Sequence, residues 1–197
     1  MAKHIIIIRR NLMAPNTNKE LNANLNIVDF KLPRWEQLPS MPLYLEQVLS
    51  LIDEWLGDYL SVGGKKIMTK TMVNNYVKLD FIDPPINKKY ERISVGKLFV
   101  IALLKPVFTI EEVSNLIDHA IDFGGNHAAQ SYNRFCDTIE QAVNHAFNQT
   151  TFEKPHDPAD PRNIYWNVCN ALASQLYVRY TYLYNAKSSG NMKTISK

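Results

Sequence analysis

The sequence lacks the short motifs on which many enzyme classes depend. It has no glycine-rich phosphate loop, no Gly-x-Ser-x-Gly nucleophile elbow and no evident pair of carboxylates. Its five histidines also lack metal-ligand spacing, because no His-x-x-x-His or Cys-x-x-Cys pattern occurs. We therefore expect neither an enzyme nor a metal protein, with no catalytic residue and no cofactor.

Cysteines and long apolar runs are also scarce. Cys136 and Cys169 lie in apolar helical contexts, so we expect reduced core residues and no disulfide. The longest apolar run, residues 98–104, is too short to span a membrane. Near the start, four isoleucines between basic residues are fewer than the roughly seven apolar residues of a signal peptide. These features predict a cytoplasmic protein with no membrane partner.

Hydrophobic residues, by contrast, are plentiful. They make up 46% of the 197 residues, which suits one globular domain or one domain with a helical extension. Residues 11–33 are rich in asparagine and show no helical or strand period, so we predict a flexible N-terminal arm over residues 1–33. Residues 187–197 are predicted to form a flexible tail.

Positive charge is concentrated in one segment. The whole chain has a net charge of +3, but residues 65–92 contain seven basic and three acidic residues, a net charge of +4. The remainder of the chain therefore has a net charge of −1. A local excess of this kind is typical of a surface that binds a polyanion such as DNA.

Helical periodicity dominates from residue 43 onward, with capping residues and prolines marking the boundaries. The third helix is predicted to be capped by Ser94, and the fourth by a capping box of Thr109 and Glu112. The expected helices run from Leu43 to the glycines at 63 and 64, from Thr69 to about Leu79, over Val95–Lys105, Ile110–Phe123 and Ala128–Asn148, and from Arg162 to about Ala186.

The second of these helices is predicted to be amphipathic, with its first amides capped by Thr69. At about 100° per residue, its polar and apolar residues occupy opposite sides. The prolines at 84 and 85 then force an extended exit. A short basic hairpin is expected over residues 86–94, with Asn87 at the turn and with Ile86, Tyr90 and Ile93 facing inward.

This polar face matches the demands of the DNA major groove, where asparagine can pair with adenine and lysine with guanine or phosphate. The predicted base contacts are Lys70, Thr71, Asn74, Asn75 and Lys78. The predicted phosphate contacts, in the loop before the helix and in the hairpin or wing after it, are Lys65, Lys66, Lys88, Lys89 and Arg92. The alternative is that the face is simply the solvated side of a surface helix.

The order of these elements resembles the winged helix-turn-helix domain of MerR-type regulators, over residues 69–117. Thr69 stands where that family caps its recognition helix, Tyr90 where it has the wing tyrosine, and "FTIEEVSNLI" where it has Phe-Ser-Leu-Glu-Glu-Ile. With "WEQLPSMPLYLEQV" upstream, the chain is still more similar to a bacterial family of unknown function, common in Firmicutes and described as MerR-like. Departures include a longer first helix, no Gly-Tyr-Arg in the wing, and neither the dimerisation helix nor the metal-binding cysteines of MerR proteins.

The resemblance implies a mainly α fold, with a MerR-like winged helix-turn-helix at 34–124, a small β-hairpin wing and further C-terminal helices at 125–186. It implies sequence-specific binding to double-stranded DNA and regulation of transcription. The main alternative is a non-catalytic adaptor that keeps the fold without binding DNA. The aromatic last helix, with Tyr177, Tyr180 and Tyr184 on one stripe, packs on its own core or on a second copy of the chain. A small-molecule sensor site among the C-terminal helices remains a third possibility.

Overall fold

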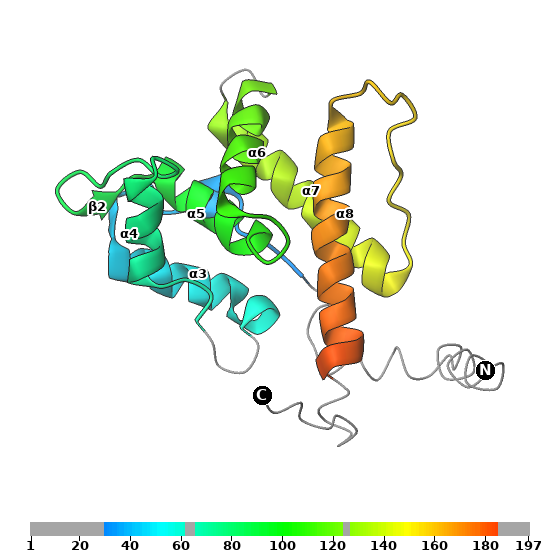
Figure 1. Ribbon diagram of the computed structural model, residues 1–197, viewed down its shortest axis with the longest axis horizontal. Helices are drawn as coiled ribbons and strands as arrows, with labels where there is room; N and C mark the ends of the chain where they lie inside the picture. Colours follow the sequence, from blue (N-terminus) through cyan, green and yellow to red (C-terminus); the bar gives the residue numbers. More distant parts are fainter. Residues whose placement is uncertain (1–29, 62–65, 124–126, 185–197) are drawn as a thin grey trace.

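The computed structural model describes residues 30–61, 66–123 and 127–184, and this part of the chain is mainly helical (Figure 1). In chain order the elements are the 3-10 helix η2 (Trp35–Gln37), β1 (Leu43–Tyr44), α3 (Leu45–Leu60), α4 (Lys70–Lys78), β2 (Lys89–Tyr90), α5 (Arg92–Leu104), α6 (Ile110–Phe123), α7 (Ala128–Asn148), α8 (Arg162–Val178) and the π-helix η4 (Arg179–Tyr184). None of the helices described is long and apolar enough to cross a lipid bilayer.

The first long helix starts two residues later than predicted, because Leu43 and Tyr44 form a strand. They pair antiparallel with β2, in the register Leu43 to Tyr90 and Tyr44 to Lys89. Helix α3 then begins at Leu45, where the side chain of Gln47 accepts a hydrogen bond of 2.9 Å from the amide of Tyr44. The small sheet therefore joins segments far apart in the sequence.

The expected hairpin over residues 86–94 is reduced to a tight turn. Ile86 and Lys89 form a single antiparallel bridge around Asn87 and Lys88, whose φ angles are 51° and 65°. Two positive φ angles in succession are typical of a type I′ turn. Asn87 is thus confirmed as a turn residue, and Tyr90 is buried as predicted. Ile86 is 65% exposed, so its predicted inward orientation is wrong.

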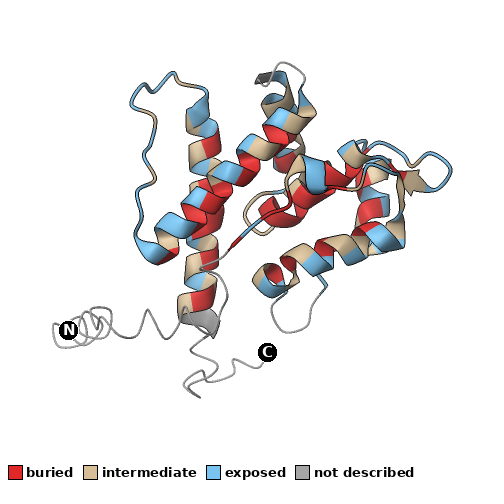
Figure 2. Cartoon of the chain, turned by 180° about the vertical axis from the view of Figure 1, so that it is seen from behind, coloured by how far each residue is buried: buried red, intermediate tan, exposed pale blue. Residues whose placement is uncertain are grey.

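Helix α5 begins at Arg92, three residues before the predicted start. Its N-cap is Glu91, whose backbone carbonyl accepts the first helical bond from the amide of Val95 at 3.0 Å. Ser94 is buried inside the helix and is not its cap, and Ile93 is 38% exposed instead of inward-facing. Figure 2 shows buried residues along this helix, which occupies the middle of the molecule.

The other predicted helix starts agree with the structure. The side chain of Thr69 accepts a hydrogen bond from the amide of Met72, and α4 follows directly. Thr109 and Glu112 exchange the two hydrogen bonds of a capping box at 2.8 and 3.2 Å, and α6 begins at Ile110. Local side-chain chemistry therefore fixes both helix starts.

The predicted arm is shorter than residues 1–33, because its last residues pack on the core. Phe30 and Leu32 are each only 4% exposed. They belong to one hydrophobic cluster that also includes buried side chains from α3 to η4. The rest of the predicted arm and the predicted tail lie outside the described residues, so both stay predictions.

The aromatic C-terminal stripe packs, as far as it is described, on its own chain. Tyr180 is 3% exposed, and the one proton of its hydroxyl is shared between the backbone carbonyls of Asp58, at 3.0 Å, and Tyr59. The ring of Tyr177 lies edge-on to Phe147 at 5.3 Å. The side chain of Tyr184 lies outside the described residues. Two of the three tyrosines therefore pack on the core of their own chain.

Candidate nucleic-acid interface

Helix α4 lies at one end of the molecule beside β2, with α7 and α8 at the other end (Figure 1). Its apolar side is anchored by Val73, which is fully buried, and by Tyr76, which is 8% exposed. The hydroxyl of Tyr76 has a raised pKa because burial disfavours the phenolate. The opposite side of α4 is therefore held outward by core packing.

Four residues make up the polar face of α4, and all of them are exposed: Thr71, Asn74, Asn75 and Lys78. Within the described part of the chain, none of their side chains takes part in a hydrogen bond or ion pair. The amide groups of Asn74 and Asn75 can therefore donate and accept hydrogen bonds to a partner. All five predicted base contacts are therefore exposed residues of α4, and Lys70 differs from the other four only in having a partner.

Lys70 is exposed but already paired. Its ammonium forms an ion pair with Glu46, which lies in the first turn of α3. The hydrogen bond from Lys70 is the main cause that lowers the pKa of the Glu46 carboxyl. An anion therefore stands at the N-terminal end of α4, a feature that the sequence reading missed because the two residues are distant in the chain.

The predicted phosphate contacts are placed in different surroundings. Lys88 is exposed at the tip of the tight turn, and Lys66 is exposed in the segment before α4. Lys89 is half-buried, with its ammonium 4.9 Å from the centre of the Tyr44 ring. Lys65 lies outside the described residues. Among the described lysines of this set, Lys66 and Lys88 are therefore more accessible than Lys89.

Arg92 does not belong to the wing, which corrects its predicted position. It is the first residue of α5, and its Nε donates to the carbonyl of Pro39 at 3.2 Å. Its guanidinium also lies 5.9 Å from the ring centre of Trp35. These contacts hold the chain before β1 against α5, because a guanidinium can donate hydrogen bonds and stack on an aromatic ring at once.

Lys105 is a supporting residue that the sequence reading did not identify. Its half-buried ammonium donates to the backbone carbonyl of Ile67 and lies 3.9 Å from the sulfur of Met72. Burial lowers the pKa of this amine below its ordinary value. The contact ties the end of α5 to the segment that leads into α4. In the sequence, the position of Lys105 directly after the apolar run 98–104 was the only signal of this role.

No group of three or more histidine, cysteine, aspartate or glutamate side chains suited to a metal ion occurs among the residues that the structure describes. His119, His127 and His145 lie on or beside α6 and α7 and are exposed. The ring of His145 contacts the carbonyl of Thr150 and lies near the Phe152 ring, at 6.2 Å between centres. This histidine therefore belongs to the packing of the loop before α8.

A family model described as a domain of unknown function (DUF1836) matches residues 33–135, just over half of the 197 residues. The match includes α3, α4, the tight turn, α5 and α6, and it ends within α7. It therefore covers the polar face of α4 and the lysines around it. Neither a curated protein nor a solved structure matches the chain.

Proposed function

We propose that this chain, which belongs to the DUF1836 family, binds double-stranded DNA in a sequence-specific manner and regulates transcription. One observation carries the proposal: a core-anchored helix presents two exposed asparagines and a lysine on a face with no same-chain partners among the described residues. The proposed role is binding and not catalysis.

The dimensions of α4 suit the major groove. An α-helix with its side chains is about 10–12 Å in diameter. A B-form major groove is about 12 Å wide and accepts one helix. In this arrangement Asn74 and Asn75 contact base edges, with bidentate pairing to adenine as the favoured contact. Thr71 and Lys78 extend the same face.

The tight turn supplies the second contact in this proposal. Lys88 stands at its tip, and β2 continues from it to the sheet formed with β1. Contacts between lysine and phosphate fix the position of a protein on DNA without reading its sequence. Lys66 and Lys88 take this role, and Lys89 contributes through its positive charge. We therefore propose a MerR-like winged helix in which the turn acts as a short wing.

The test is selection of bound fragments from a random pool of duplex DNA, followed by gel shifts at two salt concentrations. The proposal expects one enriched motif, with retention that falls steeply as the salt concentration rises. A pool that shows no enrichment after repeated rounds contradicts sequence-specific binding. Retention that does not depend on salt contradicts phosphate contacts.

A protein-interaction adaptor is the second candidate, and exposed apolar side chains at the same end favour it. Leu79 is 53% exposed, Ile86 65% and Tyr44 48%. Apolar groups of this size at one end suit a protein surface better than a phosphate backbone. The exposed anion Glu91, directly after β2, also opposes phosphate binding. Loss of all DNA retention at low salt, in a folded protein, supports this candidate.

A further inference from the structure

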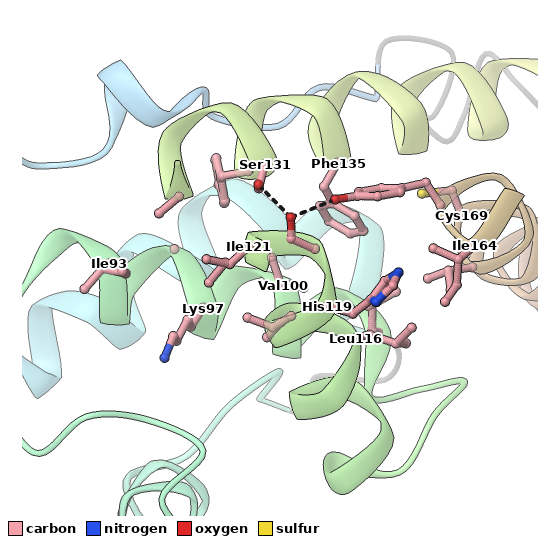
Figure 3. Close-up of a pocket in the computed structure, with 18 of the residues that line it drawn as sticks. Ile93, Lys97, Val100, Leu116, His119, Ile121, Ser131, Phe135, Ile164 and Cys169 are labelled. Atoms are coloured by element: carbon pink, nitrogen blue, oxygen red, sulfur yellow. Dashed lines mark hydrogen bonds between the residues drawn. The ribbon is translucent and has the colours of Figure 1, made fainter. Parts of the chain in front are cut away.

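A pocket lies between α5, α6, α7 and α8, away from the polar face of α4 (Figure 3). Its walls are almost entirely apolar, with Val100, Leu116, Phe135 and Val168 among the lining side chains. The cavity volume is about 80 Å³. Since a water-sized sphere takes about 10–15 Å³, the space holds roughly five to eight such spheres.

The polar groups in the wall are already satisfied by the protein. The hydroxyls of Ser131 and Tyr165 both donate to the carbonyl of Ala120, at 2.8 and 3.2 Å, as Figure 3 shows. The thiol of Cys169 is buried, and burial raises its pKa, so it stays neutral. An apolar ligand can therefore occupy the interior without forming hydrogen bonds to it.

The lining also contains two basic side chains, the exposed His119 and the cation Lys97, which lie on different sides of the pocket (Figure 3). None of the lining residues is an aspartate or glutamate. The Lys97 side chain is only 18% exposed, and its ammonium points away from the apolar side chains (Figure 3). Its nearest anion, an oxygen of Asp83, is 3.6 Å away, longer than a good hydrogen bond. Lys97 can therefore exchange this partner for another carboxylate.

We propose that this pocket binds a small carboxylate with a short apolar chain. The chain occupies the space between the four helices, and the carboxylate replaces Asp83 as the partner of Lys97. This ligand site does not depend on the proposed DNA binding, because neither the apolar pocket nor Lys97 belongs to the polar face of α4. Failure of one proposal leaves the other intact.

The experiment is a titration of the full chain with sodium hexanoate and with 1-hexanol, followed by chemical-shift changes in amide NMR spectra. The two probes have the same chain but differ in charge. We expect saturable shifts at α5 to α8, with hexanoate about threefold to tenfold tighter than 1-hexanol. Equal affinity for the two probes, or no saturable shift, overturns the proposal.

Three variants locate the site. Val100→Phe, which fills the cavity, should weaken both probes at least tenfold, whereas the exposed control Val178→Phe should not. Lys97→Met should remove the preference for hexanoate and leave 1-hexanol unchanged. Asp83→Asn, which removes the competing anion, should tighten hexanoate about twofold. If Val100→Phe fails to fold, the Lys97→Met variant is the deciding test. A Lys97→Met protein that still binds hexanoate more tightly than 1-hexanol overturns the assignment.

Discussion

Arg34 and Glu140, 106 residues apart in the chain, form a bidentate ion pair. Nη1 of the arginine lies 2.7 Å from Oε1 of the glutamate, and Nη2 lies 2.9 Å from Oε2. The Glu140 side chain, on α7, is only 7% exposed, and it also accepts hydrogen bonds from the amide of Leu32 and the ammonium of Lys31. One buried carboxylate thus fastens the segment before η2 to α7.

Replacing this carboxylate should destabilise the fold strongly. We expect Glu140→Gln to lower the free energy of unfolding by about 3 kcal/mol, because the amide carries no charge and its NH2 group cannot accept one of the two hydrogen bonds from Arg34. The matched control is Asp137→Asn, since Asp137 also bonds Arg34 but is 59% exposed; it should cost less than about 1 kcal/mol. Urea unfolding followed by circular dichroism measures both values. Equal effects would show that burial of the pair does not matter.

The same pair predicts a pH dependence. Burial alone would raise the pKa of Glu140, but the hydrogen bonds from Arg34, Leu32 and Lys31 outweigh it, so the pKa lies below its ordinary value of 4.5. A lowered folded-state pKa adds stability above pH 4.5, and that stability is lost as the pH falls through the folded-state pKa. Unfolding curves of wild type and Glu140→Gln should therefore converge in acid. A constant difference down to the lowest measurable pH would contradict the network.

Asn74 is expected to read a base. Asn74→Ala should cost about 1–3 kcal/mol of binding free energy at the selected DNA site and little on random DNA. The control is Asn115→Ala, an exposed asparagine on α6, which should change neither value. Fluorescence anisotropy with both DNAs measures the difference. Equal loss on both DNAs would refute a reading role for Asn74.

Lys88 is expected to contact phosphate without reading sequence. Lys88→Ala should weaken binding to all DNAs alike and reduce the slope of log affinity against log salt concentration by about 1. Lys154→Ala, at an exposed lysine in the loop before α8, serves as the control with an unchanged slope. An unchanged slope in Lys88→Ala as well would remove the turn from the phosphate contacts.

Glu46 should oppose DNA binding, since it pairs with Lys70 at the N-terminal end of α4. Glu46→Gln should raise the affinity for DNA about twofold to fivefold at low salt, with a smaller gain at high salt because ions screen exposed charges. Glu54→Gln, at another exposed position on α3, is the control. A gain of the same size in both variants would indicate a general charge effect and no specific role for the pair.

Tyr180 tests whether the last helix packs on its own chain. Tyr180→Phe should lower the free energy of unfolding by about 1–2 kcal/mol, because the hydroxyl bonds the carbonyls at the end of α3. Tyr177→Phe should cost less than about 0.5 kcal/mol, since no hydrogen bond of its hydroxyl to the described residues is present. Chemical denaturation compares the two. A dilution-dependent stability would instead support a shared interface between copies.

The helices were predictable wherever the signal is local. Thr69 and the pair of Thr109 and Glu112 set helix starts by side-chain bonds to nearby amides, and the structure shows these bonds. The exposure of Asn74 and Asn75 also followed from helical periodicity. Local chemistry was therefore sufficient for the exposed face of α4.

The remaining features depend on residues that meet only in three dimensions. Leu43 reads as part of a helical stripe, but it pairs with Tyr90, and no local pattern encodes that partner. In the sequence, Glu140 looks like a surface glutamate on an amphipathic helix. Its burial beside Arg34 is seen only in the folded structure. Ser94 has the right chemistry for a cap, but the helix had already begun at Arg92. Tertiary packing decided each case.

The ion pair of Arg34 and Glu140 also bears on how the chain can be divided. The family match stops at residue 135, seven residues after α7 begins and before Glu140 is reached. A fragment cut at that residue would lack Glu140, and with it the carboxylate that pairs with Arg34 and accepts the hydrogen bonds from Leu32 and Lys31. A fragment with the boundaries of the family match would therefore lack one side of this contact, and expression trials should extend at least to the end of η4.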